Sequence, residues 1–284
     1  RPFADVSLIA ASAIPMLPVP GSERPSRSGP PQEGSDIMSF LKRLFGTSVS
    51  ANAPAPERTE ADAITQCRAH VAGFDRRRQP KEWAEAMQLL GHNLMALANY
   101  AEADETLTKA LEAAGPDAHP LFRASMLKIL GETRYRHGEI LTGDERGAML
   151  ADAANTLADA LSLIQPHDNR TLWMEAATFR GAALHELGRL RAGPEGLAWM
   201  DDAAACFADI AAHGADGAVH PIGLYNRYAV LEQRGHRTVG GSRAMHYREA
   251  RDALAQAMAT GTFASRPDLT VKLAELDALI DAAD

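Results

Sequence analysis

Three glycines in one polar stretch are the first residues whose types and spacing could do chemistry. The stretch RHGEILTGDERGAMLADAA covers residues 136–154, and Gly138, Gly143 and Gly147 are interleaved in it with Thr, Asp, Glu and Arg. A helical pattern follows, and glycine-rich turns that open a helix bind phosphate in many proteins. A phosphate loop in an α/β domain also needs a preceding strand, and no strand pattern precedes this stretch. The alternative is a structural turn, which would recur in a repeated sequence.

The same glycines occur three times, which favours the structural interpretation. The first glycine of each copy lies fifteen residues before an alanine, in the pairs Gly138–Ala153, Gly188–Ala203 and Gly235–Ala250. A second glycine recurs at a fixed offset, at positions 143, 193 and 240. We interpret the glycines as a helix end and a turn that need a positive φ or a close approach. The first unit lacks ten of these residues, so the insertion is predicted to lengthen both helices and the loop between them.

The other residue types that carry catalysis form no recognisable motif. The ten histidines are scattered, and neither an HExxH pattern nor a GxSxG nucleophile elbow occurs. His119 and His220 precede prolines and are expected to be turn residues. Cys67 and Cys206 lack metal-binding spacing, so we expect buried, reduced and inert thiols in a cytoplasmic protein. The sequence therefore predicts no catalytic residues, no metal and no other cofactor.

The composition favours an all-α protein. It is 46% hydrophobic but only 6% aromatic, and few segments alternate apolar and polar residues as strands do. The net charge of −8 and the pI near 5.7 argue against a nucleic-acid partner, because a general nucleic-acid binder carries a basic face. No apolar run approaches the ~20 residues of a membrane span.

The chain is internally repeated from residue 59 onward. The first complete unit, AEAMQLLGHNLMALANYAEADETLTKALEAAGP over residues 84–116, resembles the tetratricopeptide repeat. Gly91 lies where the family needs a small residue for close helix packing, and residues 98–100 match its turn. Ala103, Leu107 and Ala110 form one stripe on the second helix. The predicted organisation is a half-repeat at 59–79, units at about 80–116, 117–166, 167–215 and 216–261, and a capping helix at 265–283.

The resemblance implies both a fold and a mode of action. The longer units resemble bacterial tetratricopeptide arrays, some of which carry a caspase-like CHAT protease domain, although no such domain follows here. The implied fold is a right-handed α-solenoid of stacked antiparallel helical hairpins, whose first helices line a concave face. On that register the candidate partner-binding residues are Glu85, Gln88, His92, Lys128, Glu132, Tyr135, Glu175, Thr178, His185, Tyr225, Asn226 and Glu232. The family's clamp for acidic chaperone tails uses Lys, Asn and Arg, whereas this chain has Gln88, His92 and Ala96 at those places.

The two ends of the chain carry separate predictions. Residues 1–58 are rich in Pro, Ser and Gly and are predicted to be a disordered leader and linker, with the native start at Met38. The segment SFLKRLFG at 39–46 is amphipathic and would make weak contact with an anionic membrane surface. At the other end, Ser265 and Asp268 match a helix capping box. The last helix has an apolar stripe and an acidic opposite side, which suits the end of a solenoid.

These observations predict a non-catalytic scaffold that binds a peptide or a partner protein on its concave face. One alternative is a membrane-surface adaptor anchored by residues 39–46, which would place this cytoplasmic, bacterial protein at the periphery of the inner membrane. Another alternative is a regulatory subunit that completes a protease or a kinase in trans. The sequence does not identify the partner.

Overall fold

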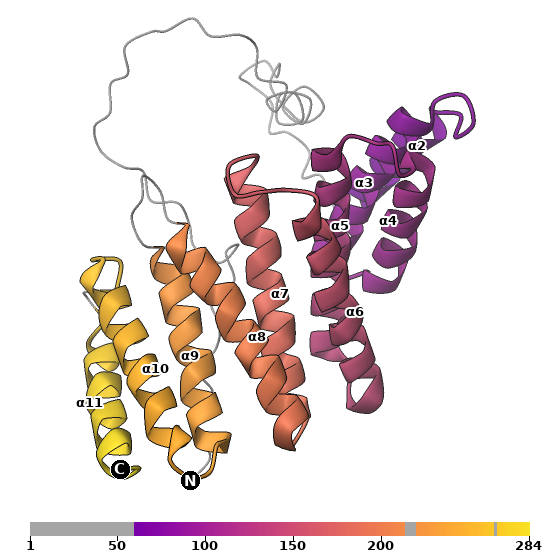
Figure 1. Ribbon diagram of the computed structural model, residues 1–284. Coiled ribbons are helices and arrows are strands. Elements are labelled where there is room, and N and C mark those ends of the chain that lie inside the picture. Colours follow the sequence, from indigo (N-terminus) through magenta and orange to yellow (C-terminus); the bar gives the residue numbers. More distant parts are fainter. Residues whose placement is uncertain (1–59, 214–219, 264–265) are drawn as a thin grey trace, which may run out of the picture.

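The described part of the protein is a row of packed helices. A computed structural model describes residues 60–213, 220–263 and 266–284 (Figure 1), and every regular element in these ranges is a helix. This confirms the predicted all-α fold class. The predicted leader and linker lie outside the described residues, as does the segment 39–46 on which the membrane-surface alternative depends. No helix in the described ranges is long and apolar enough to cross a membrane.

Ten helices follow one another with short connections. Their bounds are α2 Glu60–Ala72, α3 Pro80–Ala96, α4 Tyr100–Ala114, α5 Pro120–Ile140, α6 Gly143–Ser162, α7 Arg170–Leu190, α8 Gly193–Ala212, α9 Pro221–Arg237, α10 Ser242–Ala259 and α11 Pro267–Asp281. Four pairs, α3–α4, α5–α6, α7–α8 and α9–α10, pack side by side from one end of the row to the other. We call α3, α5, α7 and α9 the first helices, and their partners the second helices.

The second glycine of each copy has a positive φ, as its recurrence predicts, whereas Gly138 of the first copy does not lie at a helix end. Gly143, Gly193 and Gly240 have φ values of 62°, 72° and 81°, which an L-residue with a side chain rarely adopts. Gly138 lies inside α5, two residues before its end, and permits a close approach instead. A Cβ atom at this position would lie 3.0 Å from the side chain of Leu150 on α6.

In the α5–α6 and α7–α8 pairs the ten added residues lengthen the helices but not the loop. Helices α5 and α6 have 21 and 20 residues, whereas α3 and α4 have 17 and 15. The connection between α5 and α6 is residues 141–142, which is shorter than residues 97–99 of the first pair. The expectation of a longer loop was therefore wrong for α5–α6 and α7–α8, where the positive-φ glycine allows the chain to reverse within two residues. In the last pair α9 has 17 residues, as α3 has, and its connection to α10 is the longer segment 238–241.

Small residues set the distance within the helix pairs. A Cβ atom at Gly91, Gly131 or Gly181 would lie 2.5–2.7 Å from the side chain of Leu107, Leu157 or Phe207 on the second helix. Tyr228 takes this place in α9 and is itself buried. Helix α9 still approaches α10 closely at Gly235, where a Cβ atom would lie 2.5 Å from the ring of Tyr247.

Helix α11 packs against the end of the row through the predicted stripe. Leu269 and Leu276 are buried, and Leu273 and Ile280 pack partly buried against the same core. The exposed side is not purely acidic, since Val271 retains 61% of its accessible surface there. Ser265 of the predicted capping box lies outside the described residues, and Arg266 precedes the helix with its side chain bound to Asp268 at 2.7 Å.

Candidate interaction surface

The predicted partner-binding residues all lie on the first helices. Helix α5 contacts both α3 and α7 directly, whereas the second helices of neighbouring pairs make no comparable contact in the described part of the chain. Along α3, α5 and α7 the first helices therefore lie closer together than the second helices do, whereas α7 and α9 make no comparable contact. We call the first-helix side of the row the inner wall.

Polar side chains join each helix of the inner wall to the next. These contacts are Gln88–Ser125 at 2.8 Å, Lys128–Glu175 at 2.7 Å, His185–Gln233 at 3.0 Å and, from α9 to α11, Glu232–Lys272 at 2.8 Å. Each contact involves at least one residue that the sequence placed on the concave face. These residues therefore tie the units of the row together.

A chain of four charges crosses from α5 to α7 in the middle of the wall. The Lys128 ammonium group lies 2.7 Å from Glu175 and 3.5 Å from Glu132, and Arg136 binds Glu132 at 2.8 Å. Glu132 and Lys128 are largely shielded from water, while Arg136 and Glu175 remain about one-third exposed. Because positive and negative groups alternate, every charge in this chain has an opposite neighbour.

Half of the predicted partner-binding residues are buried. These residues are Glu132, Thr178, His185, Tyr225, Asn226 and Glu232. Tyr225 illustrates the reason, because its ring stacks on Phe263 at 5.2 Å and is covered from the α11 side. Glu232 is covered in the same way by Lys272. Their side chains thus do not reach the surface of the described structure, and they serve packing between the helices.

The accessible part of the inner wall lies on α3, α5 and α7. Glu85 and His92 are exposed, and Gln88, Lys128, Tyr135 and Glu175 are partly exposed. His92 lies within electrostatic range of Lys128, Glu132 and Glu175. Part of the His92 side chain reaches solvent, but desolvation by its neighbours first and the Lys128 charge second hold the pKa of His92 below its usual value. Tyr135 packs its ring 5.8 Å from Phe179, and burial raises the pKa of its hydroxyl.

Sequence reasoning missed several residues that complete these contacts. Four of them each bind a predicted residue on the same helix or on the neighbouring helix of the wall: Ser125, Arg136, Gln233 and Lys272. Only Arg136 carried a local signal, since it lies four positions after Glu132 and side chains with this spacing meet on a helix. The other three contacts depend on how neighbouring units align, which no local pattern records.

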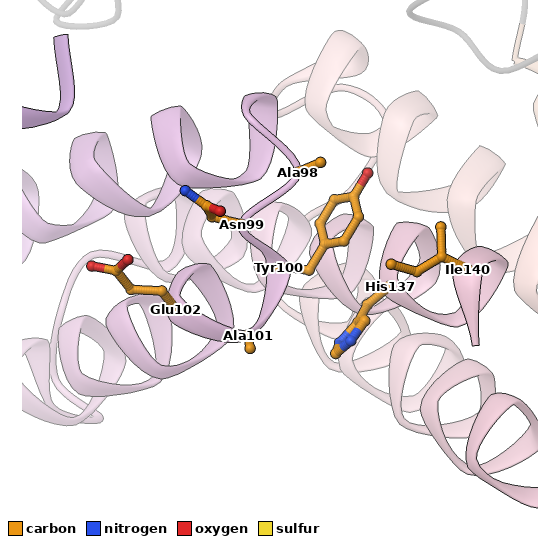
Figure 2. A pocket seen from close by; sticks show the side chains of 7 residues that line it. All are labelled: Ala98, Asn99, Tyr100, Ala101, Glu102, His137 and Ile140. Carbon is orange, nitrogen blue, oxygen red and sulfur yellow. The ribbon is translucent and has the colours of Figure 1, made fainter. Parts of the chain in front are cut away.

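A shallow hollow lies where the short first pair meets the longer second pair (Figure 2). Its volume is about 350 Å³, and it is lined by Ala98, Asn99, Tyr100, Ala101, Glu102, His137 and Ile140. The last turn of α5 extends past the α3–α4 turn, because the first pair lacks the ten added residues. The Tyr100 ring stacks on His137 at 5.9 Å, and the Glu102 carboxylate is bound by Arg68 at 2.6 Å. None of the predicted partner-binding residues lines this hollow.

Both cysteines lie within the helix packing of the described structure. Cys67 and Cys206 are buried and free, as predicted, and burial raises the pKa of both thiols. Within residues 60–213, 220–263 and 266–284, no group of three or more His, Cys, Asp or Glu side chains is arranged to hold a metal ion.

Comparison of the sequence with protein-family models and with curated proteins finds no match in either set. The internal repeat and the helix packing of this chain are therefore the observations that bear on its class.

Proposed function

We propose that the protein is a non-catalytic interaction scaffold, a right-handed tetratricopeptide-like solenoid that binds a peptide or a partner protein on its inner wall. One observation supports this proposal most strongly. The wall formed by α3, α5 and α7 combines exposed polar groups, Glu85 and His92, with the chain of paired charges beside them. A surface of this kind can recognise a ligand without changing it chemically.

The paired charges favour recognition because they make the wall rigid. Lys128 is held between two carboxylates from two different helices, so its position is determined before any ligand arrives. A preorganised side chain loses little conformational entropy on binding, which leaves more of the interaction energy as affinity. The wall presents Glu85 and Glu175 as acceptors and Arg136 as a donor, which suits a peptide of mixed charge.

The buried free thiols support a reducing compartment, and we place the protein in the cytoplasm. The mixed charge of the wall supports a partner other than an acidic chaperone tail.

The proposal is tested by reversing charges on the accessible wall. The variant Glu85→Arg/His92→Glu changes two exposed side chains of α3, so the fold should be retained. A matched control, Glu105→Arg/Lys109→Glu, reverses an exposed ion pair of 2.5 Å on α4, away from the inner wall. Proteins cross-linked to the wild type in extracts of the source cells are quantified by mass spectrometry against both variants.

We expect at least one partner to be lost from the inner-wall variant and kept by the α4 variant. Partners that are retained equally by both variants would show that the inner wall of α3 is not the binding surface. Circular dichroism at 222 nm, measured on both variants, confirms that the helices are intact.

A further inference from the structure

The hollow beside the α3–α4 turn presents an apolar surface that the inner wall does not use. Figure 2 shows Tyr100, His137 and Ile140 on one side of the hollow and Asn99 and Glu102 on the other. The Tyr100 ring stacks on His137 at 5.9 Å, and Ile140 keeps 66% of its accessible surface. Two stacked rings beside an exposed aliphatic side chain form a surface on which another aromatic or aliphatic side chain is removed from water.

Carboxylates follow this apolar surface along the chain. Asp144 and Glu145 lie in the first turn of α6, shortly after Ile140, and both are exposed. Neither forms an ion pair with any residue that the structure describes. The neighbouring Arg146 does not neutralise them, because its guanidinium group binds Glu186 on α7 at 2.6 Å. The edge of the row next to the hollow is therefore acidic, and it favours an occupant that joins bulky apolar side chains to basic ones.

The described chain begins at this same edge of the row. Arg68 of α2 binds Glu102 near the start of α4 at 2.6 Å, and Arg76 lies 3.6 Å from Glu112 near the end of α4. The chain from α2 onward therefore runs alongside α4 in the same direction. Glu60, where α2 begins, lies about 12 Å before Arg68 along the helix axis. Since Glu102 itself lines the hollow, Glu60 lies close to the rim of the hollow.

The same chain contains an occupant of the required chemistry. The segment 39–46, SFLKRLFG, lies outside the described residues, and its sequence joins bulky apolar side chains to two cations. Phe40 and Phe45 suit the surface made by the stacked rings, because aromatic rings pack favourably on one another. Lys42 and Arg43 carry the charge opposite to that of the acidic edge. The segment and the surface thus complement each other in both their apolar and their charged groups.

The place of this segment in the chain favours it over a free partner. Residues 47–59 connect it to α2 and reach at most about 45 Å when fully extended, whereas the hollow lies within roughly 20 Å of residue 60. A shallow hollow of about 350 Å³ buries little of a ligand, so a free peptide would bind it weakly. A tether of this length holds the attached segment at a local concentration of about 1 mM, at which a weak site is still filled.

From these observations we propose that the hollow is the docking site of segment 39–46 of the same chain. One of the phenylalanine rings of the segment lies against Tyr100 and Ile140, and its two cations face Asp144 and Glu145. None of the predicted partner-binding residues lines the hollow, so the docked segment leaves them accessible. The docking therefore holds whether or not the inner wall binds a partner.

Photocrosslinking in the full chain tests this docking. Phe45 is replaced by p-benzoyl-phenylalanine, whose benzophenone group inserts into nearby C–H bonds on irradiation, and the cross-linked peptides are mapped by mass spectrometry. We expect most cross-links to join residue 45 to residues 98–102 or 137–142 within a single chain. The same probe in place of Phe3, far upstream, should show no preference for the hollow.

Two exposed residues supply matched variants of the surface. Ile140→Asp places a charge in the hollow, and Val239→Asp makes the same kind of change at the α9–α10 connection, where Val239 keeps 92% of its surface. Ile140→Asp should lower the cross-link yield about fivefold, which is the fall expected when a half-filled site binds roughly tenfold more weakly. Val239→Asp should leave the yield unchanged. Circular dichroism shows whether both variants keep their helices, as exposed positions allow.

Three results would overturn the proposal. The first is a set of cross-links that is spread evenly over the described surface or is unaltered by Ile140→Asp. The second is cross-links that join two chains only, recognised by the mass of a dimer, which would make a second copy the occupant. The third is the absence of cross-links to the hollow. Attachment of the probe to lipid in added vesicles of phosphatidylserine and phosphatidylcholine would then assign the segment to a membrane surface.

Discussion

The ammonium group of Lys128 on α5 lies 2.7 Å from the carboxylate of Glu175 on α7, at the centre of the inner wall. Gln88 and Ser125 hold the corresponding places at the preceding boundary and form a hydrogen bond of 2.8 Å. The same two positions of the repeat thus join successive units at both boundaries, by an ion pair at one and by a hydrogen bond between uncharged side chains at the other. The side chains that join the first helices are ones that a peptide-binding surface would otherwise expose. The part of the wall that remains accessible to a partner is therefore limited to α3, α5 and α7.

The Lys128–Glu175 pair should contribute measurably to stability. A double-mutant cycle with Lys128→Met and Glu175→Gln is expected to give a coupling free energy of about 1 kcal/mol, because Lys128 is mostly shielded from water. The exposed Lys109–Glu105 pair on α4 is a matched reference, with an expected coupling of about 0.3 kcal/mol. Urea denaturation followed by circular dichroism measures both cycles. Equal couplings would show that the wall pair is no better ordered than a surface pair.

The close contact between α8 and α9 should not tolerate a methyl group at Gly223. A Cβ atom there would lie 2.5 Å from the backbone nitrogen of Ala211 and 2.9 Å from the carbonyl oxygen of Phe207, and neither atom can rotate away. Gly223→Ala is expected to lower the free energy of unfolding by about 2 kcal/mol or more.

Gly241→Ala is the control for this substitution, since nothing lies within 4 Å of its Cβ position and its φ is −62°. It should leave stability unchanged or raise it by about 0.5 kcal/mol. A Gly223→Ala variant as stable as the Gly241→Ala variant would mean that α8 and α9 can separate without cost.

The buried carboxylate of Glu232 should depend on Lys272 at neutral pH. Burial by itself raises the pKa of Glu232, but hydrogen bonds from His236 and Lys272 outweigh burial and hold this pKa below its usual value. Because the pKa is lower in the folded state, the contribution to stability is present above the unfolded pKa and is lost as the pH falls through the folded value.

Lys272→Met should therefore cost about 2 kcal/mol at pH 7 and less at pH 3, because the ion pair is lost as Glu232 takes up a proton with falling pH. Denaturation curves at the two pH values give the difference. Lys109→Met removes an exposed ammonium group and should cost little at either pH. A cost for Lys272→Met that is the same at both pH values would contradict the ion pair.

Acid should destabilise the whole protein through His185. Burial lowers the pKa of this imidazole from 6.5 to about 4, so the unfolded chain binds a proton over a pH range in which the folded chain does not. Stability is then complete above the unfolded pKa and falls as the pH drops toward the folded one.

Between pH 7 and pH 4 the expected loss through His185 is about 3 kcal/mol, at about 1.4 kcal/mol per pKa unit. His185→Gln should flatten this part of the pH–stability curve by the same amount, and His167→Gln should leave it unchanged. Thermal melts at half-unit pH steps give the curve. An unaltered slope in His185→Gln would place the acid sensitivity elsewhere.

Sequence spacing determined much of the helical framework of this protein. The recurrence of Gly143, Gly193 and Gly240 identified turns that need a positive φ, because glycine, which has no Cβ, enters that conformation at no steric cost. The ten-residue expansion correctly indicated longer helices in the α5–α6 and α7–α8 pairs, whereas α9 is no longer than α3. Apolar stripes placed Leu269 and Leu276 on the side of the last helix that packs against the row. All of these features depend on residues close together in the chain, where periodicity and backbone chemistry suffice.

Only the tertiary structure decided which first-helix side chains remain accessible. The register places Tyr225, Glu232 and His185 on the same side as Glu85 and His92, yet the first three are buried and the last two are exposed. The difference arises from neighbours far away in the chain, since Phe263 and Lys272 cover α9, and α9 itself reaches His185. Burial depends on the long-range packing of whole units, and the pattern within one unit carries no record of what the next unit places against it.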